Sequence, residues 1–427
     1  MIFALIIVLA IVLLVAGFEM LLVLSIPALA YKEAFYARLP DAAVVQKIVG
    51  GIDHSTLLAI PFFIFAANLM GSGQIARQLI SVVKALVGHT KGGMGHVVVG
   101  GSMAFGAVSG SAPATVAAMG RMVYPELRRA GYSDKFSLGL LVSSAETALL
   151  IPPSITLIVY GWITGTSISK LFAGGLAVGL LLGFAFSVYV RIQAARDGVQ
   201  HDTRLPWPAR LKAIWEAKWA LGMPVIILGG IYSGIITPTE AAAVSVVYAI
   251  LVEMFVFRAL DLKGLAKITE DSAVNTSIIF VLLAMGGLIS FFVTLAQVPN
   301  EIIAFLEASG AGKITFLIAV NVLFFVAGMF IDPNSTLLVL VPPLYPVAMS
   351  FGIDPVHFGM LVTLNVSLGM ITPPFGLDIF VASSTLNKPV ADIIRGVWPF
   401  VLVNLIVLLL ITYIPQISLF IPKLIYG

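Results

Sequence analysis

Apolar segments long enough to cross a lipid bilayer recur along the whole chain. Of its 427 residues, 59% are hydrophobic and only 11% are charged, whereas soluble proteins carry about 25% charged residues. Segments 1–30, 176–190 and 401–414 contain almost no charge, and about 20 such residues in a helix cross a hydrocarbon core. The sequence therefore predicts an all-α polytopic membrane protein in a lipid bilayer. A net charge of +3 in this setting gives no indication of nucleic-acid binding.

Apolar windows predict nine full spans and two interrupted stretches. The interrupted stretches, 97–127 and 314–349, each carry a polar break. If each returns to the side from which it enters, 18 of the 24 Lys and Arg residues lie on one side. The positive-inside rule makes that side cytoplasmic, which predicts a cytoplasmic N-terminus and a C-terminus on the outer side of the membrane. The nine spans, the first taken as one uncleaved helix, are residues 2–30, 55–71, 136–164, 171–190, 219–235, 239–257, 274–296, 357–386 and 397–421.

Two parts of the chain share their prolines and glycines at a constant offset of 221 residues. Pro152-Pro153 corresponds to Pro373-Pro374, and Tyr124-Pro125 corresponds to Tyr345-Pro346. In the predicted topology the two copies run in opposite directions, so the repeat is inverted. Inverted repeats with interrupted helices are typical of secondary transporters, because irregular backbone at membrane depth is tolerated only where it lines a cavity or is buried in protein.

Each interrupted stretch is predicted to be a re-entrant helical hairpin. The leading limb of the first, 97–109, would be about 20 Å long as a helix, too short to cross. Ser111 could cap its returning limb and Pro113 suits a first helical turn; in the second hairpin Asp332 or Asn334 could cap. The alternative, ordinary surface turns between two short spans, requires spans shorter than the bilayer.

Polar residues at the hairpin tips and before the double prolines form the candidate site. Freed carbonyls and half-helix ends can replace part of the hydration shell of a sodium ion, and helix N-termini attract anions. The tip hydroxyls could also merely satisfy the backbone, and Arg121 could be a cytoplasmic anchor. The candidate sodium ligands are Ser109, Gly110, Ser111, Thr115, Ser143, Ser144, Thr147, Asn334, Ser335, Thr336, Asn365, Ser367 and Thr372. The candidate substrate-binding residues are Asp332, Ser111, Pro113, Asn334 and Arg121.

Four acidic residues fall within predicted membrane elements, where an ionised side chain costs a few kcal/mol on insertion scales. Asp332 combines charge with a helix break and is favoured as a site residue. Glu146 and Asp378 flank the double prolines and are either functional or partners for freed backbone donors. Glu240 follows Thr237 at the spacing of a capping box, which indicates a structural role.

Other classes of function are disfavoured. Residues Ser309–Lys313 resemble a phosphate-binding loop but lack its first glycine and its final Ser or Thr, so the energy for transport must come from an ion gradient. The absence of cysteine and of zinc-ligand spacing among the histidines argues against a transition-metal site. No nucleophile–base pair is evident, so the chain is predicted not to be an enzyme and to need no cofactor beyond Na⁺ as the coupling ion.

Several longer segments resemble the large membrane subunit of tripartite ATP-independent periplasmic (TRAP) transporters, and this resemblance covers nearly the whole chain. The segments are GGMGHVVVGGSMAFGAVSGSAPATVAAMG (92–120), IPPSITLIVYG (151–161), TPTEAAAVSVVYA (237–249), DPNSTLLVLVPPLYPVA (332–348) and LNVSLGMITPPFGLDIFVASS (364–384).

The resemblance implies a sodium-driven importer of organic acids with an elevator-type moving domain. It places the chain in the bacterial inner membrane, so that the expected C-terminus is periplasmic. It also implies a small four-helix membrane subunit, expected here on a separate chain, and a periplasmic substrate-binding protein. Within the family the sequence is most similar to sialic acid (N-acetylneuraminate) permeases, with a C4-dicarboxylate permease as an alternative. An ion channel subunit is the runner-up from another class.

The expected organisation has two transport halves set between scaffold segments. Residues 1–90 form scaffold helices and a first arm, and 166–312 form scaffold helices and a second arm. Residues 391–427 form a C-terminal helix. The transport halves are 91–165, with hairpin 97–127 and broken helix 136–164, and 313–390, with hairpin 314–349 and broken helix 357–386.

Overall fold

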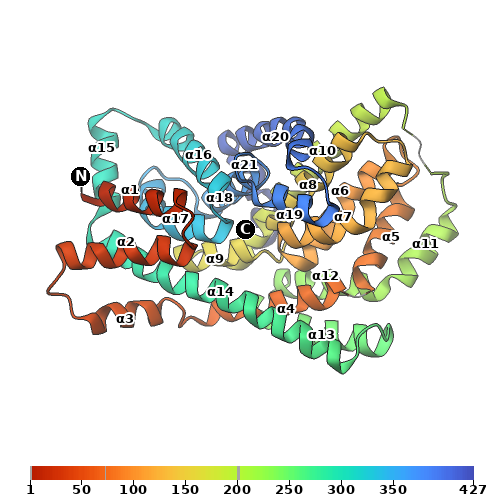
Figure 1. Cartoon of the computed structure of the whole chain (residues 1–427). Helices are drawn as coiled ribbons and strands as arrows, with labels where there is room; N and C mark the ends of the chain where they lie inside the picture. The colour runs from red at the N-terminus through yellow and green to blue at the C-terminus, as the bar shows by residue number, and fades with distance from the viewer. Residues whose placement is uncertain (1, 73, 200–201) are drawn as a thin grey trace.

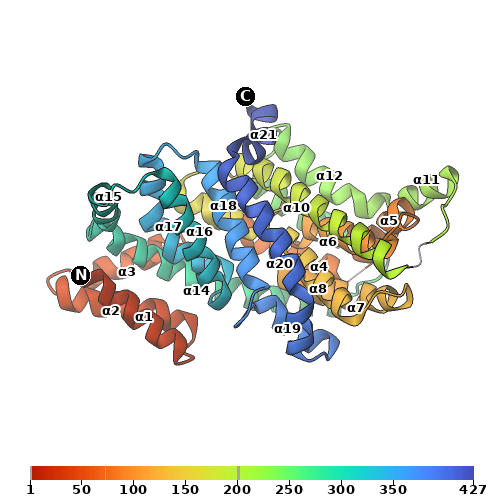
Figure 2. The same cartoon turned by 90° about the horizontal axis from the view of Figure 1, so that it is seen from above.

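The computed structural model describes residues 2–72, 74–199 and 202–427, and within these ranges it contains helices and loops but no β-strand. Met1 and Gly73 of the predicted first scaffold segment lie outside the described residues, as do Gln200 and His201 of the loop that follows span 171–190. Figures 1 and 2 show an elongated assembly of helices in which the middle of the chain joins two helical groups. The chain is an all-α polytopic membrane protein.

The helices before the first repeat are α1 (Ile2–Val15), α2 (Met20–Phe35), α3 (Asp41–Gly50), η1 (Ser55–Leu58), α4 (Ala59–Ser72) and α5 (Ile75–Val87). The first repeat contains α6 (Gly93–Ser109), α7 (Ala112–Arg129), α8 (Asp134–Ala145), η2 (Glu146–Leu149) and α9 (Ile155–Thr164).

The middle segment contains α10 (Ile168–Asp197), α11 (Trp207–Glu216), α12 (Lys218–Tyr232), α13 (Pro238–Leu251), η3 (Val252–Val256), α14 (Leu262–Leu295) and α15 (Val298–Ala308). The second repeat and the C-terminal helices are α16 (Lys313–Phe330), α17 (Pro333–Ser350), α18 (Pro355–Met370), α19 (Leu377–Leu386), α20 (Val390–Tyr413) and α21 (Pro415–Tyr426).

Among the described residues, five helices are long and apolar enough to cross a membrane, namely α10, α13 with η3, α14, α16 and α20. The number rises to seven if two bent helix pairs each count as one span. One pair joins α3 to the helix at 55–71 with a bend of 51°, and the other joins α11 to α12 with a bend of 69°. Interrupted helices therefore make up much of the membrane-embedded part of this chain.

Two predicted continuous spans are wrong. The predicted helix 2–30 is divided at Gly17, whose φ of 81° turns the chain before α2 begins, a conformation that glycine adopts without steric cost. The predicted helix 397–421 ends at Tyr413, and Pro415 begins α21, because proline has no N–H and clashes with the preceding turn of a helix. The short helices α3 and α15 were not predicted.

The two hairpins and two broken helices are present where the sequence predicts them. The hairpins are α6–α7 and α16–α17, and the broken helices are α8–η2–α9 and α18–α19. Both double-proline pairs lie in the breaks and both have cis peptide bonds. The limbs are longer than predicted, however: α6 has 17 residues rather than 13 because it begins at Gly93. Length alone therefore does not distinguish a re-entrant limb from a crossing one, and α16 is itself long and apolar enough to cross.

Glycines set the spacing between the long helices. A Cβ on Gly139 of α8 would lie 2.0 Å from the carbonyl oxygen of Gly396 on α20, so the two backbones touch. A Cβ on Gly175 of α10 would lie 2.3 Å from the carbonyl oxygen of Leu150 in the first break. Small residues allow such close packing in membranes, as the Gly175, Gly179 and Gly183 spacing indicates. The C-terminal helix α20 is thereby fixed to the first broken helix.

We predict that Gly139→Ala destabilises the protein by about 1–3 kcal/mol, the usual cost of overpacking a close contact. Thermal unfolding of the purified protein in detergent measures this effect. The control is Gly229→Ala in α12, where a Cβ would meet no atom within 4 Å and alanine is the better helix former. Equal unfolding temperatures for the two variants would contradict the packing described above.

Candidate functional site

Each hairpin tip is closed by a side-chain cap on its returning helix. In the first tip Ser111 Oγ accepts a hydrogen bond from the backbone N–H of Ala114 at 3.4 Å, and Pro113 lies in the first turn of α7. In the second, Asp332 Oδ1 accepts from the N–H groups of Asn334 and Ser335 at 3.0 and 3.1 Å. The predicted cap at Ser111 is confirmed, and of the two predicted alternatives in the second tip the cap is Asp332.

Each tip also packs against the break in the broken helix of its own repeat. A Cβ on Gly110 would lie 2.6 Å from the carbonyl oxygen of Pro153. In the second repeat the N–H of Gly376 donates to the carbonyl oxygen of Met329 at 3.2 Å, and the rings of Phe330 and Phe375 are 5.7 Å apart. Each tip is therefore in contact with the break of its own repeat, although Phe330 and Phe375 at the second contact are exposed in this chain.

The two repeats meet at these elements. Ala112 of the first tip, Leu149 of the first broken helix and Met370 of the second form a small buried apolar cluster. One apolar contact thus brings the first tip and both breaks to a common centre.

Several buried side-chain oxygens at the tips and on the broken helices have no hydrogen-bond partner among the described residues. An oxygen left unpaired in this way costs about 1–3 kcal/mol, so their number indicates that something else satisfies them. Cations suit acceptor-only oxygens such as those of carboxylates and amides. The unpartnered atoms are Ser143 Oγ, Ser144 Oγ and Glu146 Oε1 in the first repeat, and Asn334 Oδ1, Ser335 Oγ, Asn365 Oδ1 and both carboxylate oxygens of Asp378 in the second.

The remaining predicted hydroxyl ligands donate to the backbone of their own helices. Thr115 donates to Ser111 O at 2.8 Å and also contacts Ser109 Oγ. The same pattern holds for Thr147, Thr336, Ser367 and Thr372, whose hydroxyls donate to carbonyl oxygens three or four residues earlier. These bonds use the hydroxyl proton and stabilise the local backbone. The hydroxyl oxygen can still accept, so the role of these residues as sodium ligands stays a prediction.

A chain of hydrogen bonds between amide and hydroxyl side chains crosses the second repeat. These hydrogen bonds were not predicted from the sequence. Asn365 on α18 donates to Asn321 Oδ1 on α16 at 2.8 Å, and Asn321 donates to Thr412 Oγ1 on α20 at 3.0 Å. On the same helix α20, Asn404 donates to Glu146 Oε2. The available signal was an asparagine inside each apolar span, but the partners lie 44 to 258 residues apart.

The structural role considered for the buried carboxylates of Glu146 and Asp378 was to accept hydrogen bonds from freed backbone N–H groups. The structure shows no such bonds among the described residues. Glu146 has a side-chain partner, Asn404, and Asp378 has no partner at either oxygen although it is fully buried. Asp378 lies in the first turn of α19, where the helix dipole favours negative charge. Glu240 does form the predicted capping box with Thr237.

Arg121 is not brought to the tip. It is exposed on α7, ten residues after Ser111, which corresponds to about 15 Å along the helix. The position is closer to an anchor at the end of the hairpin than to the centre formed by tips and breaks.

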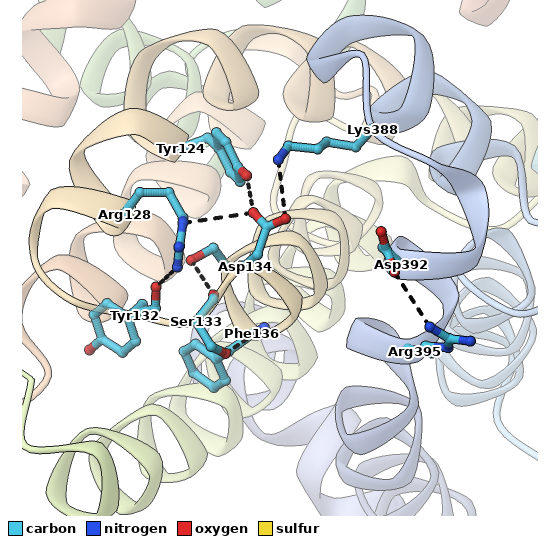
Figure 3. A network of polar contacts seen from close by, with 10 residues as sticks. Tyr124, Arg128, Tyr132, Ser133, Asp134, Phe136, Lys388, Asp392 and Arg395 are labelled. Atoms are coloured by element: carbon cyan, nitrogen blue, oxygen red, sulfur yellow. Dashed lines mark hydrogen bonds and ion pairs between the residues drawn. The ribbon is translucent and has the colours of Figure 1, made fainter.

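A charged cluster joins the two repeats at the end of the molecule that the charge distribution assigns to the cytoplasm (Figure 3). Asp134, at the start of α8, accepts from Tyr124 of α7 and pairs with Lys388 at 3.1 Å and with Arg128 at 3.7 Å. Partial burial opposes ionisation of Asp134, but the Tyr124 hydrogen bond and the Lys388 and Arg128 charges lower its pKa overall. Hydrogen bonds with Tyr124 and Asp134 raise the pKa of Lys388.

Residues 3–417 match the family described as tripartite ATP-independent periplasmic transporter, DctM component. Among curated relatives, the ectoine/5-hydroxyectoine TRAP transporter large permease of Ruegeria pomeroyi is 41% identical over 98% of both chains. The ectoine TRAP transporter large permease of Halomonas elongata is 42% identical over 96% of this chain and 97% of its own.

The predicted narrowing to a sialic acid permease is not supported. The sialic acid TRAP transporter large permease of Vibrio cholerae is 38% identical over 90% of each chain, which is below both ectoine permeases in identity and coverage. Among solved structures, the Alcanivorax borkumensis YdaH transporter covers 91% of this chain and 89% of its own, with a TM-score of 0.60 and 13% identity. At that identity the likeness extends to the fold alone.

The Asp134 cluster generates a prediction with a defined pH range. A lowered pKa for Asp134 stabilises the fold above the unfolded value of about 4, and a raised pKa for Lys388 stabilises it below about 10.4. We expect Asp134→Asn to lower stability by about 0.5–1 kcal/mol at pH 7, since both side chains are about one-third exposed. The difference from wild type is expected to vanish as pH falls through the folded pKa of Asp134.

Unfolding temperatures of both proteins between pH 3 and 8 test this prediction. Asp392→Asn is the control, because its ion pair with Arg395 joins residues of one helix and not the two repeats. A pH-independent difference for Asp134→Asn would show that the charge of Asp134 is not what stabilises the cluster.

Proposed function

The chain belongs to the DctM component family of tripartite ATP-independent periplasmic transporters, and we propose that it imports a small carboxylate-bearing solute by coupling to sodium. It is a transport permease rather than an enzyme, and membership of this family implies the bacterial inner membrane. The observation that carries the sodium proposal is the set of unpartnered buried oxygens at the hairpin tips and breaks.

The charge balance explains why cations and an organic acid would move together. A carboxylate brought into a low-dielectric site needs compensating positive charge, and sodium ions at the two breaks supply it. The pseudo-symmetry of the site favours one ion per repeat, near Ser143 and Ser144 in one and near Asn365 in the other. Each net positive charge that enters the cell gains about 2.3 kcal/mol per 100 mV of membrane potential.

The solute we propose is of the ectoine type, a small molecule with one carboxylate. Its support is the higher identity and fuller coverage of the two ectoine permeases. A C4-dicarboxylate permease of Pseudomonas aeruginosa, 39% identical over 90% of this chain, supports the main alternative. In this proposal Asp332, Ser111, Pro113 and Asn334 lie next to the solute, while the position of Arg121 does not favour it.

We further propose that the two transport halves move together against the scaffold as an elevator. The shared apolar cluster of Ala112, Leu149 and Met370 and the Asp134 cluster link the halves to each other. The backbone contact of Gly139 with Gly396 would carry α20 with them, so the moving unit would include part of the predicted C-terminal segment. A four-helix small subunit and a periplasmic binding protein would complete the transporter.

Uptake into proteoliposomes that contain the permease, the small subunit and the binding protein tests the function. We expect saturable uptake of ectoine that requires an inward sodium gradient and is faster with a negative interior. Uptake that follows solute concentration without saturation would favour the ion-channel alternative. Saturable uptake that is indifferent to sodium would contradict the coupling proposal.

We predict that Ser144→Ala raises the sodium concentration for half-maximal uptake about 5- to 30-fold, equivalent to one lost ligand worth about 1–2 kcal/mol. Ser144 Oγ has no protein partner, so its removal should leave the unfolding temperature unchanged or higher. Ser277→Ala on α14 is the matched control, because that hydroxyl is exposed and bonds only to its own helix. An unchanged sodium dependence in Ser144→Ala would remove Ser144 from the site.

A further inference from the structure

A cavity of about 570 Å³ lies between four helices that come from both the predicted scaffold and the predicted transport halves. Its walls are formed by α3 and α14 on one side and by the end of α9 and the face of α17 on the other. These helices are neighbours in the left half of Figure 1. The volume is in the range of pockets that hold small ligands. The cavity lies at the end that the charge distribution assigns to the periplasm.

The wall formed by α17 leads to the second hairpin tip. Leu338 and Pro342 line the cavity, and they follow Asn334 by four and eight residues on the same helix. Residues at this spacing share one face of a helix, and four residues correspond to about 6 Å. Leu338, which lines the cavity, and Asn334, which lies in the hairpin tip, therefore share one face of α17 and are one helical turn apart.

The cavity carries a positive charge, the side chain of Lys47, and this charge can bind a solute. Lys47 of α3 is the one charged side chain among the described residues that line it, and its Nζ lies 5.0 Å from the ring centre of Phe291 on α14. No carboxylate of the described chain pairs with Lys47, in contrast to the nearby Lys32, which pairs with Asp41 at 2.6 Å. A cation beside an aromatic ring, without an acidic partner, is suited to an incoming anion.

The position of Lys47 is fixed by a backbone contact. A Cβ on Gly287 of α14 would lie 2.7 Å from the Cα of Gly51, just beyond the end of α3. The neighbouring residue Gly286 lies against Leu338 of α17, where a Cβ would come within 2.3 Å of its side chain. The same two glycines thus hold the helix that carries Lys47 and bring the scaffold into contact with the second hairpin.

We propose that this cavity receives the carboxylate of the transported solute before it reaches the second hairpin tip, and that Lys47 binds that carboxylate. The solute class is a small molecule with at least one carboxylate and an apolar face, because Trp162 and Phe291 form part of the wall. The inference rests on the proposed function as an importer of organic acids, and it assigns the outer binding step to residues outside the hairpin tips.

The first test is the solute dependence of sodium-driven ectoine uptake in the reconstituted complete transporter. Removing the charge in Lys47→Gln is expected to raise the KM for ectoine about ten-fold or more, the size expected when a hydrogen bond to a charged group is lost. The maximal rate and the sodium dependence should stay unchanged, and Lys47→Arg should restore most of the affinity. Lys423→Gln, an exposed lysine on α21, is the matched control and should behave as wild type.

The second test detects binding without transport and uses Trp162 in the cavity wall. Ectoine, with succinate as a second carboxylate, should quench part of the tryptophan fluorescence of the purified permease, and this part should be absent in Trp162→Phe. It should require about ten-fold more ectoine in Lys47→Gln, and this measurement remains decisive if that variant assembles poorly into the transporter.

An unchanged KM in Lys47→Gln, or quenching that does not depend on Trp162 or Lys47, would overturn the inference while sodium-driven uptake by wild type still stands. Absence of sodium-driven uptake in wild type would instead reject the proposed function, whatever the behaviour of Lys47.

Discussion

A backbone polar group that enters a hydrocarbon layer must find a partner within the protein, and the whole arrangement follows from how this chain meets that requirement. Unbroken helices such as α10 and α14 satisfy it internally. The tips and the double-proline breaks do not, and each tip packs against the break of its own repeat. Gly110 packs on Pro153 in one repeat, and Gly376 bonds to Met329 in the other. The irregular backbone is therefore concentrated at one centre.

That centre contains more oxygen acceptors than donors. Caps at Ser111 and Asp332 use the N–H groups at the start of each returning helix, and threonine hydroxyls donate to their own helices. The oxygens left over, on Asn365 and Asp378 among others, accept no hydrogen bond from any residue that the structure describes. An excess of acceptors at membrane depth is a stable arrangement only when cations or protons compensate it, which is why the proposal centres on sodium.

The cavity beside Lys47 complements this centre because it carries the opposite charge. An anion drawn in by Lys47 would travel along the α17 face toward a tip whose own polar groups are mainly acceptors, and it would meet bound cations there. Separate places for the first contact with the anion and for its charge compensation suit a permease in which the scaffold stays fixed and the hairpins move. The contact of Gly286 with Leu338 lies where the proposed scaffold meets the second hairpin.

The sequence alone determined features that depend on a few consecutive residues: most of the apolar spans, the breaks at Pro152-Pro153 and Pro373-Pro374, and the cap at Ser111. For the second tip it left the cap open between Asp332 and Asn334. Local steric rules and hydrogen bonds over three or four residues are sufficient for these. The bond between Asn404 and Glu146 across 258 residues and the cavity around Lys47 were decided by tertiary structure. They depend on which helix faces meet, and in a chain whose helices are apolar on nearly every side, hydrophobic periodicity does not specify those faces.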